Sequence, residues 1–89
     1  MSTPLSRFVK LLNASPRRME SFKKAGISLL KQKSKIEDME RKFDPMFGQM
    51  HEREEIVAST RVYEANKDKM MQGTGLREEE LFDLINKYV

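Results

Sequence analysis

The sequence contains no cysteine, so disulfide bonds, thiol catalysis and thiolate metal sites are all excluded. Only three prolines and four glycines interrupt its 89 residues, and they gather at a few points. β-branched residues are too sparse to support a sheet. No apolar run approaches the ~20 residues that a membrane-spanning helix needs, and the start of the chain lacks the apolar stretch of a signal peptide. We therefore expect an all-α protein that is intracellular and cytoplasmic.

Residue patterns typical of enzymes are also missing. There is no glycine-rich phosphate loop followed by Lys-Ser or Lys-Thr, and no serine, histidine and acid set that would activate a nucleophile. His51 is the only histidine, and it shares a helical face with a nearby carboxylate, from Glu54 or Glu55. One histidine and one or two carboxylates from a single helix do not form a specific metal site. We predict a non-enzymatic protein with no catalytic residues, no metal and no cofactor.

Three pairs of residues combine a helix-capping side chain with proline, which is the arrangement typical of a helix start. These pairs are Thr3-Pro4, Ser15-Pro16 and Asp44-Pro45. Residues 73–75, Gly-Thr-Gly, indicate a loop and the C-cap of the helix before it. The third pair has two interpretations, because a proline here either kinks one long helix or turns the chain into a hairpin.

These signals divide the chain into four predicted helices that form a single domain over residues 1–89. Two are long, at about 16–43 and 45–72, and two short helices flank them at about 4–13 and 76–88. The expected fold is a helical hairpin or a small bundle.

Apolar residues recur at every seventh position along the first long helix, as they do in the seam of a coiled coil. The row consists of Phe22, Leu29, Ile36 and Phe43, with Met39 beside it. The last helix has an apolar face of its own, formed by Leu81, Leu84, Ile85 and Tyr88. Two helices of roughly 42 Å are too long for two short ones to cover. We therefore expect a coiled-coil-like seam with a protein partner or with another copy of the chain.

Seven methionines give the chain soft and adaptable apolar surface. Five of them lie near the predicted seams, at Met39, Met46, Met50, Met70 and Met71. They serve either as packing, including packing between copies, or as an exposed groove for a partner. Gly26 lies inside the first long helix, where it marks either a weak point or a close approach between helices.

The net charge of +3 hides a strong asymmetry along the chain. Residues 1–35 carry nine Lys or Arg against one acid, for a net charge of +8. Residues 36–89 carry eight against thirteen, for a net charge of −5. Such a division indicates an anionic partner for the basic half, or docking of one half onto the other.

Three functions agree with these patterns. The first is a protein-interaction module, an adaptor, assembly factor or inhibitor of a larger complex that also associates with itself. The second is sequence-tolerant binding of nucleic acid by basic residues of the first long helix, namely Arg17, Arg18, Lys24, Lys31 and Lys35, of which all but Arg18 fall on one helical face. The third is peripheral contact of the first helix with a membrane, through apolar Leu5, Phe8, Val9 and Leu12 beside Arg7 and Lys10.

Overall fold

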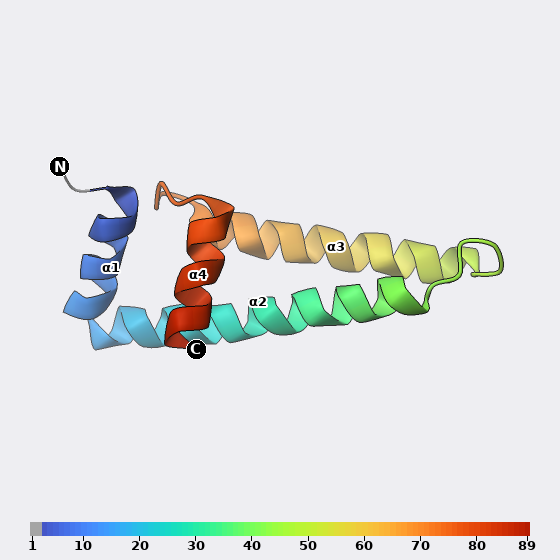
Figure 1. Ribbon diagram of the computed structural model, residues 1–89, viewed down its shortest axis with the longest axis horizontal. Coiled ribbons are helices and arrows are strands. Elements are labelled where there is room, and N and C mark those ends of the chain that lie inside the picture. Colours follow the sequence, from blue (N-terminus) through green and yellow to red (C-terminus); the bar gives the residue numbers. More distant parts are fainter. Residues whose placement is uncertain (1–2) are drawn as a thin grey trace.

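In the computed structural model, which describes residues 3–89, the chain forms four α-helices and this part contains no strand (Figure 1). The helices are α1 (Pro4–Ala14), α2 (Pro16–Lys42), α3 (Met50–Met71) and α4 (Glu78–Tyr88). The predicted all-α fold is thus confirmed, with helices close to the expected ranges.

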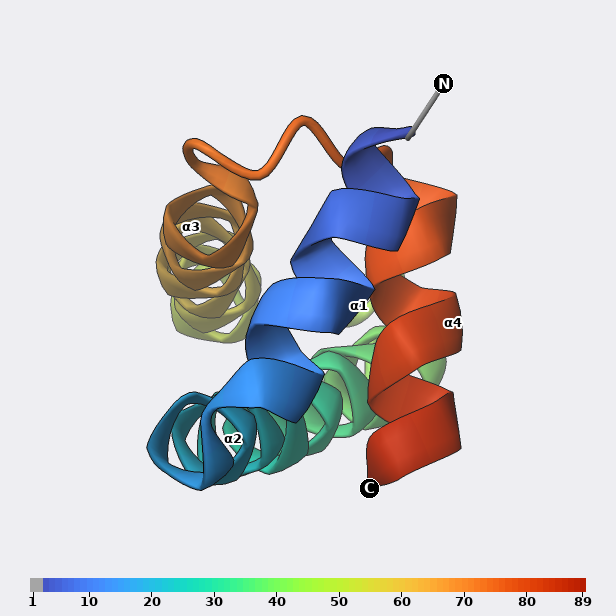
Figure 2. The ribbon, with the colours of Figure 1, turned by 90° about the vertical axis from the view of Figure 1, so that its left-hand side faces the viewer.

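The two long helices, α2 and α3, lie side by side and run in opposite directions (Figure 1). The short helices α1 and α4 both cross α2 near its start, and α4 lies on one side of the α2–α3 layer (Figure 2). The result is an elongated molecule with extents of 53 × 23 × 17 Å. We call the end where α1 and α4 pack on α2 the closed end.

The first two predicted helix starts are formed as capped helices. The Thr3 hydroxyl oxygen accepts the Ser6 N–H at 3.1 Å, and the Ser15 hydroxyl oxygen accepts the Arg18 N–H at 3.4 Å. Each cap precedes a proline in the first turn of its helix, where the missing N–H has no partner to lose.

Asp44-Pro45 is a hairpin turn, and α3 begins only at Met50 instead of Pro45. The Asp44 carboxylate accepts the N–H groups of Met46 and Phe47 at 2.9 and 3.4 Å, and the Asp44 carbonyl accepts the Gly48 N–H at 2.6 Å. These bonds satisfy the backbone in a turn, so the same aspartate that resembles a helix cap in the sequence closes a loop.

The last helix begins at Glu78, two residues beyond the predicted start at residue 76. The Glu80 carboxylate accepts the Arg77 N–H at 3.0 Å, which fixes this helix start. Leu76 is therefore part of the loop before α4, where its side chain is buried in the core.

The hydrophobic core lies at the closed end, where α4 crosses α2. Leu29, Leu81 and Ile85 are its most completely buried large side chains. Gly26 faces Ile85, and a Cβ added to Gly26 would lie 3.0 Å from the Ile85 Cγ2 atom. Of the two interpretations of this glycine, the close approach between helices is therefore the one that the structure shows.

Aromatic rings extend this core toward α1. The Phe22 ring makes edge-to-face contacts with Phe8 of α1, at 5.6 Å between centroids, and with Tyr88 of α4, at 6.5 Å. One residue of α2 therefore joins both short helices to the hairpin.

Among residues 3–89, Lys67 is the only charged residue that is buried. Its ammonium group lies 2.7 Å from a Glu64 carboxylate oxygen and 3.1 Å from one of Glu78. Hydrogen bonding to Glu64, and less strongly to Glu78, raises the pKa of Lys67 above its usual 10.5 despite burial. The pair with Glu78 connects the last turns of α3 to the first turn of α4.

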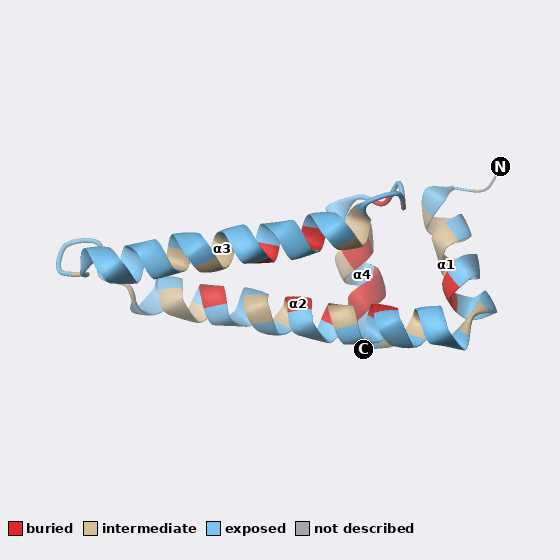
Figure 3. Ribbon diagram, turned by 180° about the vertical axis from the view of Figure 1, so that it is seen from behind, coloured by how far each residue is buried: buried red, intermediate tan, exposed pale blue. Residues whose placement is uncertain are grey.

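The core does not continue to the other end of the hairpin. Between residues 37 and 62 no residue is buried, although Met39, Phe43 and Ile56 are half-buried between α2 and α3 (Figure 3). Only two helices contact each other there, and two helices cannot enclose a side chain as four can.

Candidate interaction surfaces

The most exposed apolar side chains lie where the hairpin turns. Met46, Phe47 and Met50 are 84%, 81% and 78% exposed, while no other large apolar side chain in residues 3–89 exceeds 55%. We call these three residues the hairpin tip. Monomeric soluble proteins rarely expose large contiguous apolar patches, so these three neighbouring side chains form a candidate binding surface.

The turn that carries the hairpin tip has a defined shape. Asp44 holds it through the three backbone bonds described above, and Gly48 leaves no room for a side chain. A Cβ at Gly48 would meet the Asp44 carbonyl oxygen and lie 2.5 Å from a carbon of the Phe43 ring. The hairpin tip therefore lies on a turn whose backbone conformation is held by hydrogen bonds and close packing, at one end of the elongated molecule.

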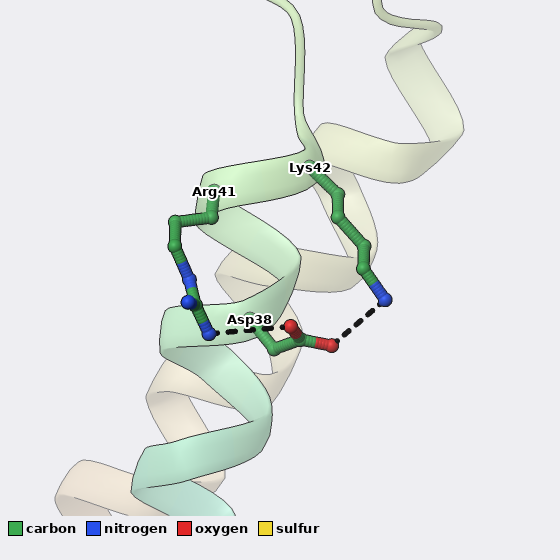
Figure 4. Close-up of polar contacts among 3 residues, drawn as sticks. All are labelled: Asp38, Arg41 and Lys42. Carbon is green, nitrogen blue, oxygen red and sulfur yellow. Dashed lines mark hydrogen bonds and ion pairs between the residues drawn. The ribbon is translucent and has the colours of Figure 1, made fainter.

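Charged groups of both signs surround the tip. Asp38 forms ion pairs with Arg41 at 3.3 Å and with Lys42 at 3.0 Å in the last turns of α2 (Figure 4). The two cations also lie where the helix dipole favours positive charge. Since Asp38 already pairs with both cations, the tip region offers no strong net positive charge for an anionic surface.

The side chains predicted to form a seam lie inside the chain. Leu29, Ile36, Phe22, Leu81, Leu84 and Ile85 are buried, and Met39, Phe43 and Tyr88 are half-buried. The buried members come from α2 and α4 and belong to a single core, which also includes Leu12 of α1 and Tyr63 of α3. The buried members are thus used in packing within the chain, whereas Met39, Phe43 and Tyr88 keep part of their surface exposed.

One broad side of the α2–α3 layer is left uncovered, and we call it the open face. Figure 3 shows this side, with α4 behind the two long helices. A groove runs between α2 and α3 on it, and Asn66 crosses the groove to donate a hydrogen bond to the Gln32 side chain at 3.1 Å. Toward the closed end the groove is lined by Gln32, Lys35, Ile36, Ala58, Ser59 and Val62. Toward the tip it is lined by Met39, Lys42, Phe43, Glu52, Glu55 and Ile56.

Four of the predicted phosphate-binding residues share this side of α2. At 100° per residue, Arg17, Lys24, Lys31 and Lys35 fall within a band of about 40°, which we call the basic stripe. Gly26, which faces α4, lies about 140–180° from the three lysines, so these lysines are on the side away from α4. All four side chains are exposed, and among residues 3–89 only Lys24 of these four has an ion pair, at 3.6 Å from Glu20.

Arg18 lies off this stripe, in the elbow between α1 and α2. The elbow is a shallow depression with an apolar floor of Phe8, Leu12 and Phe22. Its rim is polar and carries Ser15, Arg17, Arg18 and Ser21. The structure thus brings Arg17 into both the basic stripe and the elbow.

The remaining sequence features are placed as follows. Leu12 of α1 is buried and Leu5, Phe8 and Val9 are half-buried against the core, so the apolar face of this helix packs on the protein. None of the helices in residues 3–89 combines the length and the apolar character that a bilayer crossing requires. His51, Glu54 and Glu55 are exposed, and the described part of the chain contains no cluster of three side chains arranged to hold a metal ion.

Comparisons with protein-family models, with curated proteins and with solved structures found no match to this chain.

The sequence pattern predicts that Met46 and Met50 lie near seams, and it does not single out Phe47. Their exposure follows from the turn at Asp44, which ends α2 and removes the next residues from the helical repeat. A signal was present, because Asp44, Pro45 and Gly48 place three turn-forming residues within five positions.

Proposed function

We propose that this chain is a non-enzymatic protein-interaction module that associates with further copies of itself, using the hairpin tip as a contact. The exposure of Met46, Phe47 and Met50 carries the proposal. Covering one large apolar side chain contributes about 1.5–3 kcal/mol, so three together supply a substantial part of an association energy.

A protein surface suits the tip better than an anionic membrane does. Glu52, Glu54 and Glu55 follow the tip in α3, and Asp44 precedes it. These carboxylates would be repelled by anionic headgroups, whereas a protein surface can offer basic groups to them.

Association through the tip is tested by measuring the solution mass of the full chain by light scattering over a range of concentrations. Replacing Phe47 with Ser should lower the fraction of the oligomer, because it removes a large apolar group from the contact. The matched control is Leu11→Ser, which removes an apolar side chain that is 49% exposed on α1. A wild-type chain that remains monomeric at the highest concentrations would contradict self-association.

We propose nucleic-acid binding as a second function, and the placement of the basic stripe supports it. Four basic side chains lie along one exposed line of α2, and three of them have no ion pair within residues 3–89. Phosphates that contact such residues release counterions, so binding should weaken steeply with salt.

A short mixed-sequence duplex tests this second function. Lys24→Glu combined with Lys31→Glu should abolish binding at low salt without changing helicity. The control reverses two exposed lysines outside the stripe, Lys10→Glu with Lys23→Glu, at the same cost in net charge. If both double variants lose affinity equally, the net charge of the chain and not the stripe determines binding.

A further inference from the structure

The two ends of this elongated molecule carry charge of opposite sign. At the end with the elbow, residues 4–24 contain six Lys or Arg against one acid, for a net charge of +5. At the end with the hairpin tip, residues 37–62 contain four against seven, for a net charge of −3. Arg18 and Lys42 are separated by about 24 residues of α2, or roughly 36 Å. Because this is several times the Debye length of about 8–10 Å, the two ends cannot neutralise each other within one chain.

The acidic residues at the start of α4 do not cancel the positive charge of the elbow. Three of them line a depression with Lys33, which is about 15 residues, or roughly 22 Å, from Arg18 along α2. The one acid of residues 4–24, Glu20, lies 3.6 Å from Lys24 in an ion pair. The rim of the elbow therefore presents the charges of Arg17 and Arg18.

The elbow can receive an apolar side chain beside these charges. Its floor of Phe8, Leu12 and Phe22 is carbon surface, and the depression has a volume of about 460 Å³. This is room for a large side chain such as the exposed ring of Phe47. The elbow thus suits an apolar group that is accompanied by negative charge.

The hairpin tip has this complementary character. Its three large apolar side chains are exposed, and Asp44 and Glu52 flank them in the sequence. Guanidinium groups bind carboxylates with strong, paired hydrogen bonds, so the arginines at the elbow rim match the acids around the tip. Two tips would repel each other, and so would two elbows, whereas a tip and an elbow attract.

A contact between unlike ends leaves a free tip and a free elbow on every pair of molecules. A two-fold pair that closed both contacts through the open faces would bring Lys31 and Lys35 of the two copies together near its axis, where they would repel. Contacts between unlike surfaces that do not close add further copies in an open chain. We therefore expect the contact to propagate beyond two copies.

We infer that copies of this chain associate head to tail, with the hairpin tip of one molecule seated in the elbow of the next and Arg17 and Arg18 of that elbow facing the carboxylates around the tip. This inference rests on the proposed self-association and names the surface that the tip contacts. The average mass in solution should then rise steadily with concentration past twice that of one chain, and it should fall as salt is added.

Two variants of the full chain, each lacking one side of the contact, test the inference. Phe47→Ser removes the large apolar group of the tip and keeps the elbow, whereas Arg17→Glu with Arg18→Glu reverses the elbow rim and keeps the tip. Each variant alone should associate more than about tenfold more weakly than the wild type. An equimolar mixture contains one intact tip and one intact elbow, so light scattering should show a mass that stops close to twice that of one chain.

A control variant separates position from net charge. Lys31→Glu with Lys35→Glu makes the same charge change as the elbow variant at two exposed positions in the middle of α2. Lys31 is about 13 residues, or roughly 20 Å, from Arg18, so this control should associate like the wild type. Circular dichroism should show unchanged helicity in all variants, because every substituted side chain is exposed.

The outcomes distinguish the inference from the function on which it rests. A wild-type mass that stops at two chains, an elbow variant that associates like the wild type, or a mixture that stays monomeric overturns the head-to-tail contact and leaves self-association standing. Equal losses in the elbow variant and the control also overturn it, because net charge would then be the cause. A wild-type chain that is monomeric throughout overturns both.

Discussion

The two ends of this molecule differ in what their apolar residues do. At the closed end, α2 is in contact with three other helices, and Leu29, Leu81 and Ile85 are almost completely removed from water. At the hairpin tip, Met46 and Phe47 are more than four-fifths exposed. We therefore expect the closed end to supply most of the stability of the fold. Substitutions at the hairpin tip should change that stability little.

The largest effect should come from the closed end. Leu81→Ala would leave a cavity against α2 and should lower the free energy of unfolding by about 2–5 kcal/mol. Phe47→Ala removes a larger side chain at the tip but should change the free energy of unfolding by only about 0.5 kcal/mol or less. Urea unfolding at a concentration where the chain is monomeric measures both, and comparable losses would mean that the two ends share the stability.

The Lys67 ion pairs, which also belong to the closed end, should make stability depend on alkaline pH. The pKa of Lys67 is raised in the folded protein, so its proton is held more tightly there than in the unfolded chain. Its contribution is present below pH 10.5 and is lost as the pH rises through the higher folded pKa. Lys67→Met should therefore lose less stability than the wild type between about pH 10 and 12.

Tyr63 also titrates in this range, and both proteins retain it. Burial raises the pKa of Tyr63 above 10.0, so its contribution likewise falls as the pH rises. The charge of Lys67 also lowers the Tyr63 pKa, so the difference between wild type and Lys67→Met in urea unfolding at each pH measures Lys67 together with its effect on Tyr63. Parallel pH curves for the two proteins would contradict a stabilising role for the ion pairs.

The smallest effect should come from the ion pairs near the tip. Arg41 and Lys42 are about three-quarters exposed and Asp38 is about half exposed, so water and salt screen their attraction. Asp38→Asn should lower the free energy of unfolding by about 0.5 kcal/mol or less. A loss as large as that of Leu81→Ala, measured in the same way, would show that the tip end is stabilised as strongly as the closed end.

The fold was largely predictable because its signals are local. Thr3-Pro4 and Ser15-Pro16 cap helices wherever they occur, and the repeat of Phe22, Leu29 and Ile36 indicates a buried helical face. These patterns depend on neighbours within one or two turns, so they can be read from the sequence.

The surfaces were harder to predict because they depend on which side each helix covers. The seven-residue repeat of apolar side chains on α2 does not show that α1 and α4 of the same chain bury Phe22 and Leu29. That burial depends on the close crossing of α4 over α2 at Gly26. Nor does the repeat show that α4 leaves the side with Lys24 and Lys31 uncovered. Exposure at the tip depends on the turn at Asp44, whose side chain could equally have capped a helix.

No residue between positions 37 and 62 is buried, so this part of the hairpin acts as a spacer that sets the distance between the core and the tip. Because the core lies outside this stretch, the length of the rod is independent of the packing that folds it. Inserting one heptad into α2 and another opposite it in α3 would keep every helical face in register and move the tip outward by about 10.5 Å. The distance at which this protein presents its apolar tip is thus an adjustable property of the sequence.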